Sequence, residues 1–126
     1  VYTKCPSGAP LVQHSLVVML EHFKNGKISL ERIVEKMAHN PAILFRIEKR
    51  GFIREGYKAD LVLVDLNQNW TVEKENILYK CGWSPWEGTE FHSQVTHTFV
   101  NGNLVYENGK ITQEKFGERL LFEVEE

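Results

Sequence analysis

The sequence has no excess of charge of one sign. Its 126 residues include 15 Lys and Arg and 17 Asp and Glu, which gives a formal net charge of -2. The basic residues are scattered among acidic ones, so no basic stripe is available to neutralise phosphates. We therefore expect no nucleic-acid partner.

Long hydrophobic runs are also missing. No apolar stretch approaches the roughly 18 residues that cross a bilayer, and none follows a basic leader at the start. We therefore expect no membrane partner and a soluble, cytoplasmic chain. Apolar residues make up 42% and charged residues 25% of the sequence, an ordinary globular composition, and this length supports one core.

Cysteine and histidine patterns that bind metals are absent too. Cys5 and Cys81 form no Cys-x-x-Cys pair, so both are predicted to be free thiols, and Cys81 a small core residue beside Trp83. The five histidines include no His-x-His and no His-Glu-x-x-His. The chain is therefore predicted to hold no metal site of its own.

Two amphipathic helices are predicted in the first third of the chain. Apolar residues recur at helical spacing over residues 11–23 and stop at Asn25-Gly26. Ser29 can cap a second helix. Pro41 is expected to end that helix, with one further helical turn over residues 42–45.

After residue 51 the periodicity changes to that of strands. Residues 52–53 and 61–64 are short apolar runs bounded by turn residues, and the second run is predicted to be buried on both faces. Residues 70–72 and 77–79 are further candidate strands. A β-rich second part is therefore expected.

The last third contains two turn signals. Asn101-Gly102 separates two alternating runs, residues 95–100 and 104–106, and predicts a two-residue hairpin. Asn108-Gly109 marks another turn. The remainder, from residue 113 onward, is predicted to be a short amphipathic tail.

The sequence has features of a piece of a longer protein. It begins at Val1 rather than Met, within a loop-like stretch. Five or six short strands after a pair of helices would also leave long sheet edges open, which proteins usually cover or pair. A partner segment elsewhere in a longer chain would solve this.

Three stretches carry a family resemblance. Residues 40–65, with Asn40-Pro-Ala and Glu55-Gly-Tyr-Lys-Ala-Asp-Leu-Val-Leu-Val-Asp65, resemble the C-terminal part of the amidohydrolase superfamily. Cys5-Pro-Ser-Gly-Ala-Pro-Leu-Val-Gln-His14 is similar to the loop after the eighth barrel strand of dihydroorotases. Lys80-Cys-Gly-Trp-Ser-Pro-Trp-Glu-Gly88 is similar to a segment of their sandwich domain.

The resemblance implies a fold of α/β plus β class. Residues 1–50 would be the last loop and helices of a metal-dependent (β/α)8 TIM barrel. Residues 51–112 would form the C-terminal part of an appended β-sandwich, and residues 113–126 a C-terminal tail. The likeness covers nearly all of this chain but only about the last third of a family member.

The resemblance also implies an activity for the parent protein. Dihydroorotases use zinc to interconvert dihydroorotate and N-carbamoyl-aspartate in pyrimidine biosynthesis. No catalytic residue and no metal ligand of that family maps onto this chain, so the isolated chain is expected to be inactive. The expected partners are the small cyclic amide, the remainder of the same enzyme and further copies of it in a homo-oligomer.

The resemblance assigns substrate contact to the loop at Pro6, Ser7 and Gly8. A residue without Cβ lets the backbone approach a planar ring closely, and Pro6 limits the loop's freedom before binding. Without the resemblance, this loop would be interpreted only as the entry to a helix.

Other candidate residues are interpreted as structural. His14, His92 and His97 are lone histidines expected to pack or to lie at the surface. The two aromatics Trp83 and Trp86 are expected to anchor their turn against a core or a neighbouring subunit. Asp60 and Asp65 fit turns and solvation better than a carboxylate pair.

Two alternatives to a dihydroorotase stay open. An allantoinase or a dihydropyrimidinase (hydantoinase) shares the Asn-Gly hairpin and differs in the cyclic amide it accepts. A metal-free member of the superfamily could instead serve as an assembly scaffold.

Overall fold

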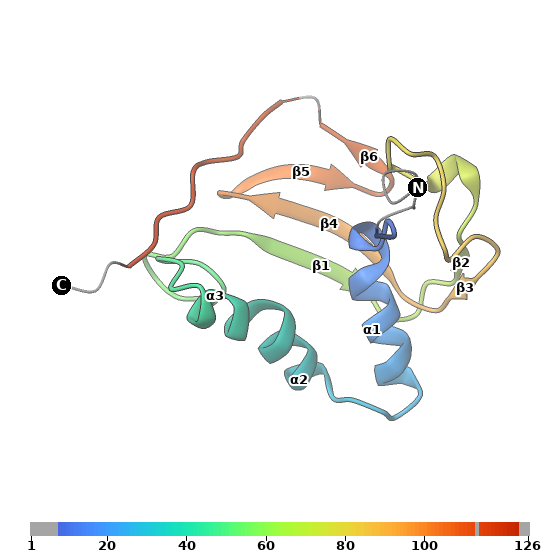
Figure 1. Ribbon diagram of the computed structural model, residues 1–126, viewed down its shortest axis with the longest axis horizontal. Coiled ribbons are helices and arrows are strands. Elements are labelled where there is room, and N and C mark those ends of the chain that lie inside the picture. Colours follow the sequence, from blue (N-terminus) through green and yellow to red (C-terminus); the bar gives the residue numbers. More distant parts are fainter. Residues whose placement is uncertain (1–7, 113, 124–126) are drawn as a thin grey trace, which may run out of the picture.

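The computed structural model describes residues 8–112 and 114–123, with helices first and strands after them (Figure 1). The helical part comprises η2 (Val12–His14), α1 (Ser15–Lys24), α2 (Leu30–Val34), η3 (Glu35–His39) and α3 (Asn40–Leu44). The strand part comprises β1 (Leu61–Asp65), β2 (Trp70–Thr71), η4 (Lys74–Asn76), β3 (Glu90–Phe91), β4 (Gln94–Val100), β5 (Asn103–Glu107) and β6 (Lys110–Ile111).

The first predicted helix is confirmed. A 3-10 turn, η2, leads into α1, and the helix ends where the backbone N–H of Gly26 bonds to the carbonyl of Phe23 at 2.9 Å. Gly26 has φ +68°, the left-handed conformation that favours glycine after a helix. The sequence signal at Asn25-Gly26 therefore marked the true helix end.

The second helix begins as predicted but does not end at Pro41. The Ser29 side chain accepts a hydrogen bond from the N–H of Arg32 at 3.2 Å. The helix then continues through η3, a π-helical turn, into α3, where Pro41 stands in the first turn. A wider π turn accommodates a proline because it shifts the backbone hydrogen bonds that the proline cannot make.

Four strands form an antiparallel sheet in the order β1-β4-β5-β6. The register of β1 on β4 shifts between Leu63 and Val64, and that of β4 on β5 between Thr98 and Phe99. The predicted hairpin is confirmed, with Asn101 at φ +51° and Gly102 at φ +82°. Two positive φ values in succession are those of a type I′ turn.

The chain before β1 and between β1 and β4 is less regular than predicted. Residues 70–71 form the short strand β2, which pairs with β3 in a separate two-stranded sheet. Residues 52–53 and 77–79 are not strands, so these two predictions were wrong. The 3-10 turn η4 precedes residues 77–79 and turns the chain, and side chains described below hold that stretch in place.

The hydrophobic core lies between α1 and the two-stranded sheet. We define the aromatic core as the buried residues Val17, Val72 and Phe91 together with the half-buried Trp70 and Trp86 that pack against them. The Trp70 and Phe91 rings have centroids 5.6 Å apart, and those of Trp86 and Phe91 lie 6.1 Å apart. The aromatic core thus joins the first helix to a region more than fifty residues later.

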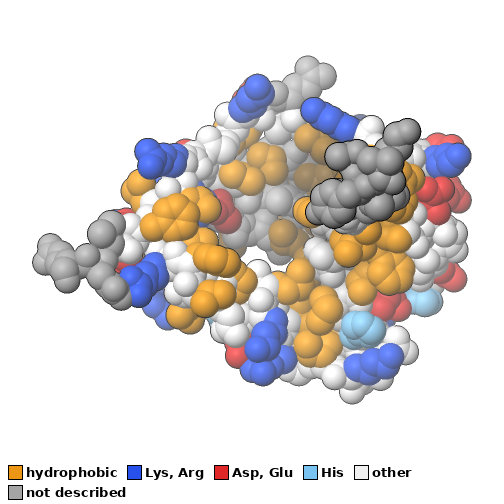
Figure 2. Space-filling model, viewed as in Figure 1, with side chains coloured by type: hydrophobic (Ala, Val, Ile, Leu, Met, Phe, Trp, Pro, Cys, Tyr) orange, Lys and Arg blue, Asp and Glu red, His pale blue; other side chains and the backbone are white. Residues whose placement is uncertain are grey.

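The four-stranded sheet contributes none of the buried hydrophobic side chains of the described residues. Val62 and Leu63 of β1 are exposed, so the prediction that this run is buried on both faces is wrong for the chain as it stands. Exposed apolar residues also occur along α3, where Leu44 is 74% exposed. Figure 2 shows hydrophobic side chains on the surface around a hollow in the middle of this face.

Residues near the C-terminus pair with the chain that follows α3. Ile47 and Phe122 form an isolated antiparallel bridge. The N–H of Glu48 bonds to the carbonyl of Leu121 at 3.0 Å, and the N–H of Glu123 to that of Arg46 at 2.9 Å. The described part of the predicted tail is therefore irregular but fixed to the helical part. No described helix is long and apolar enough to span a membrane.

Candidate functional site

The predicted substrate loop leads into η2 and α1. Pro6 and Ser7 lie outside the described residues, whereas Gly8 is described and exposed. Gly8 has φ +76°, and a Cβ placed on it would meet nothing within 4 Å. The position therefore combines open space on its outer side with a backbone conformation that side chains disfavour.

Gln13, in the η2 turn before α1, contacts the chain around η4. Its side-chain amide donates to the carbonyl oxygen of Asn76 at 2.7 Å and accepts from the N–H of Leu78 at 2.9 Å. Its backbone N–H donates to the Tyr79 hydroxyl at 2.7 Å. The Gln13 amide thus hydrogen-bonds to backbone groups at and just before residues 77–79 that would otherwise need a neighbouring strand as partner.

His14 is wholly buried. Its Nδ1 shares a hydrogen bond with the Ser84 hydroxyl at 3.1 Å. Its ring lies 6.3 Å from that of Phe91 in a stacked arrangement and 5.9 Å from that of Tyr79 in a T-shaped one. Burial lowers the pKa of His14 below its usual 6.5, because it disfavours the charged imidazolium. The interpretation of His14 as a packed residue is confirmed.

The turn at residues 83–86 is anchored by one of its two tryptophans. The Ser84 hydroxyl accepts from the N–H of Trp86 at 3.2 Å, and Trp86 packs on the aromatic core. Trp83 is 46% exposed, and Cys81 is exposed as well. The prediction that Cys81 is a core residue is wrong, because the turn directs only Ser84 and Trp86 inward.

No metal centre is formed by the part of the chain that the structure describes. No three side chains of His, Cys, Asp or Glu in residues 8–112 and 114–123 gather in a way that could hold an ion. His92 instead pairs with Glu21, Nδ1 to Oε2 at 3.1 Å, and His97 with Glu107, Nε2 to Oε1 at 3.4 Å. The described residues therefore do not fit a zinc ion.

The two aspartates that flank β1 have structural partners. Asp65 accepts from the N–H of Asn67 at 2.8 Å, as expected for a turn. Asp60 accepts from the N–H of Asn101 at 2.8 Å and pairs with Arg50. Arg50 also donates to the Asn101 side chain at 2.8 Å, so Asp60 fixes the hairpin tip to the segment after α3.

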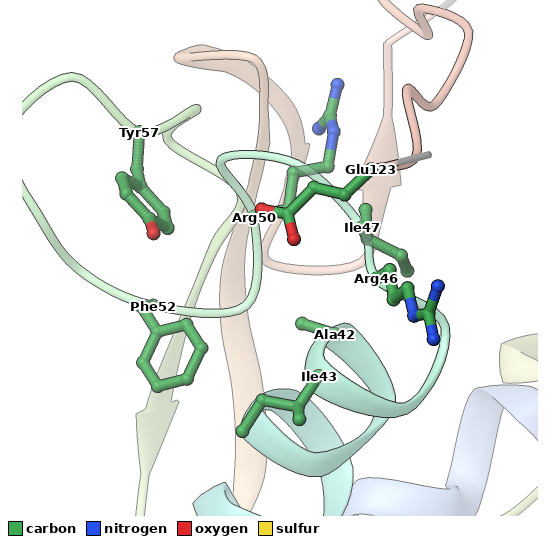
Figure 3. Close-up of a pocket in the computed structure, with 8 residues that line it drawn as sticks. All are labelled: Ala42, Ile43, Arg46, Ile47, Arg50, Phe52, Tyr57 and Glu123. Atoms are coloured by element: carbon green, nitrogen blue, oxygen red, sulfur yellow. The ribbon is translucent and has the colours of Figure 1, made fainter. Parts of the chain in front are cut away.

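A pocket of about 210 Å³ lies beside α3 (Figure 3). It is lined by Ala42, Ile43, Arg46, Ile47, Arg50, Phe52, Tyr57 and Glu123. In Figure 1, α3 and the C-terminal stretch lie at one end of the molecule and the start of α1 lies away from them. The lining of the pocket contains no Ser, Cys or His that could act as a nucleophile or a base. Its one carboxylate is that of Glu123, and Arg50 is already bound to Asp60 and Asn101.

The resemblance proposed Gly8, but the sequence did not predict the contacts that hold the chain after it. Gln13 lies in the stretch that resembles the dihydroorotase loop, but Asn76 is 63 positions away, and no sequence pattern links the two. The sequence feature nearest to these contacts is the turn at Ser84-Pro85, since turns of this kind commonly anchor a segment against the core.

Comparisons with known proteins identify the family of the chain. The model of the amidohydrolase family matches residues 7–105. A dihydroorotase of Pyrococcus abyssi is 34% identical over 117 residues, which cover 93% of this chain and 29% of that protein. An allantoinase of Desulfitobacterium hafniense is 34% identical over 114 residues, 90% of this chain and 25% of that protein.

A solved structure, the L-hydantoinase (dihydropyrimidinase) from Arthrobacter aurescens, superposes with a TM-score of 0.83 at 33% identity. The match covers 94% of this chain and 27% of that one. The chain thus spans less than a third of the length of these relatives. Since the family model covers most of the sequence, the chain belongs to the amidohydrolase family.

Proposed function

We propose that this chain is the C-terminal part of a dihydroorotase. The complete enzyme would hydrolyse dihydroorotate reversibly to N-carbamoyl-aspartate in pyrimidine biosynthesis. The observation that carries the proposal is the similarity to dihydroorotases, 34–36% identity over more than nine tenths of this chain for three Pyrococcus proteins. Gly8, which is exposed and has a positive φ, supports the proposed contact with a planar ring.

In this proposal the work is divided between this chain and the rest of the enzyme. Zinc, which activates water and polarises a carbonyl in such enzymes, would be held by residues outside this chain. Pro6, Ser7 and Gly8 would contact the pyrimidine ring through their backbone. The isolated chain would then be silent; stoichiometric zinc binding and hydrolysis of dihydroorotate by the 126 residues alone would refute this division.

The proposed fold follows the same division. Residues 1–50 would be the last loop and helices of a (β/α)8 barrel, residues 51–112 part of a β-sandwich and residues 113–126 a tail. The sheet order, which leaves β1 and β6 at the edges, supports the addition of strands from polypeptide outside this chain. A crystal structure of the complete protein would test it.

A second candidate activity is hydrolysis of allantoin or of a hydantoin or dihydropyrimidine. The allantoinase similarity and the L-hydantoinase superposition favour it. The complete protein should be assayed with dihydroorotate, allantoin, hydantoin and dihydrouracil side by side. A kcat/KM highest for dihydroorotate supports the first proposal, and a higher value for another substrate replaces it.

Substitution Gly8→Val tests the substrate loop in the complete enzyme. A β-branched residue at φ +76° would distort the backbone, and misplacement of a contacting group lowers kcat/KM by about 10- to 100-fold. Bound zinc should be unchanged.

Gly26→Val is the matched control, because Gly26 has φ +68° and equally open surroundings in the turn after α1. It should reduce stability but leave kcat/KM within about twofold. If Gly8→Val has the same steady-state kinetics as the wild type, the loop does not contact the substrate.

A further inference from the structure

Gln13 makes three hydrogen bonds to residues that lie 63 to 66 positions later in the chain. Two come from its side chain, to the backbone of Asn76 and Leu78, and one from its backbone N–H to the Tyr79 hydroxyl, all at 2.7–2.9 Å. Gln13 stands only five positions after Gly8. These bonds therefore fix the chain shortly after the proposed substrate loop.

The partners of Gln13 are themselves braced. The Asn76 side chain accepts from the N–H of Glu73 at 3.1 Å and donates to the carbonyl of Thr71 at 2.7 Å. Ile77 packs against the aromatic core, and the Tyr79 ring lies edge-on to His14. Gln13 is thus bound to a support whose position is set by β2 and by buried side chains.

Among the described residues, no buried apolar side chain lies between Gly8 and Gln13. Leu11 is exposed and Val12 is 86% exposed. The local bonds there, such as the N–H of His14 to the carbonyl of Leu11 at 3.1 Å, shape the turn but do not tie it to the rest of the molecule. That tie is made by Gln13 and, one residue later, by His14 with Ser84.

We propose that Gln13 and Tyr79 are positioning residues for the substrate, which act by holding the backbone after Gly8 at a fixed place. The inference rests on the proposed contact between the Gly8 loop and a cyclic amide. A preorganised loop loses less conformational freedom on binding. Loss of these bonds therefore raises KM while kcat, which depends on groups elsewhere, changes little.

The test uses the complete enzyme with Tyr79→Phe, which deletes only the hydroxyl that accepts from the Gln13 N–H, and with Gln13→Leu, which removes both side-chain bonds at similar volume. The controls are Tyr106→Phe in β5 and the exposed Gln68→Leu. Two quantities are measured: KM and kcat for the hydrolysed substrate, and amide hydrogen exchange of the peptide over residues 9–14 without substrate.

For each positioning variant we expect KM to rise about 5- to 10-fold, as loss of one or two hydrogen bonds implies, with kcat within about twofold. Exchange over residues 9–14 should quicken by a similar factor, and the controls should change neither quantity. An unchanged KM, or an equal rise in the controls, overturns the inference.

Failure of the proposed function can be told apart from failure of this inference. If dihydroorotate is not hydrolysed, the same KM comparison is made with whichever of allantoin, hydantoin or dihydrouracil is turned over. If none is, the proposed function fails, and hydrogen exchange still decides whether Gln13 and Tyr79 hold the loop. Unchanged hydrogen exchange over residues 9–14 in both variants would show that Gln13 and Tyr79 do not hold this stretch in place.

Discussion

The aromatic core and the four-stranded sheet are built from similar residues but differ in how far the chain completes them. Val72 and Phe91 are buried beneath α1, whereas Val62 and Leu63 of β1 remain exposed. The core is closed by a helix of the same chain, and the sheet meets no such cover among the described residues. The chain therefore supplies its own support for the Gly8 loop and leaves the faces of the sheet unfinished.

The largest effect expected from this comparison is that of Phe91→Ala. Phe91 is 2% exposed and touches both Trp70 and Trp86, so its truncation should lower the free energy of unfolding by about 3–5 kcal/mol. Denaturant unfolding of the complete protein, followed by tryptophan fluorescence, measures it. A loss below about 1 kcal/mol would contradict the assignment of the core.

Val62→Ala is the counterpart in the sheet. In this chain by itself, where Val62 is exposed, the substitution should lower the free energy of unfolding by less than about 1 kcal/mol. A loss of about 2 kcal/mol or more in the complete protein would show that other polypeptide buries this face, as the proposed β-sandwich requires, and the contrast between the two regions would then hold only for this chain.

The next largest effect concerns the junction between the helical part and the strands. Gly51 has φ +80°, and a Cβ there would meet the Ala42 Cβ at 2.4 Å and the Ala38 carbonyl oxygen at 2.8 Å. Gly51→Ala should therefore lower the free energy of unfolding by at least about 1 kcal/mol more than an alanine substitution at a glycine that has the same φ but free space around it.

Gly56→Ala is that matched control, because Gly56 has φ +78° and a Cβ placed there would meet nothing within 4 Å. It should cost about 1–2 kcal/mol. Equal losses of unfolding free energy in the two variants would mean that α3 does not pack closely on residue 51.

The smallest effect is a pH dependence from His14. Because burial lowers its pKa below 6.5, folded and unfolded forms are both neutral above that pH. As the pH falls below 6.5, the unfolded chain takes up a proton that the folded chain resists, so stability declines until the folded-state pKa is reached.

His14→Phe keeps a ring against Phe91 and removes the titration. The drop in melting temperature from about pH 7.5 to about pH 5.5 should be smaller in this variant than in the wild type, while His22→Gln, on the same helix, should retain the full drop. An equal drop in His14→Phe would exclude His14 as its source.

Features set by a few neighbouring residues were predictable from the sequence. Ser29 caps its helix and Asn101-Gly102 turns its hairpin, because both depend on local backbone and hydrogen-bond preferences. Pro41 was misjudged although its rule is also local, since the π turn before it relieves the constraint.

Features that depend on distant partners were not predictable. Residues 77–79 have a strand-like composition, but Gln13 takes the bonds that a neighbouring strand would have made. Cys81 resembles a core residue in type, yet its turn points it outward. At the candidate site, Gly8 remains a prediction that rests on the family resemblance, while the contacts of Gln13 and Tyr79 could be recognised only from the fold.

The pairing of residues 46–48 with residues 121–123 has a practical consequence. A truncation before Leu121 would remove the carbonyl that receives the Glu48 N–H and the bridge from Phe122 to Ile47. The chain just beyond α3 would then lose these pairing partners, and a shortened protein prepared for crystallisation would begin to fray at residues 46–48 as well as at its cut end.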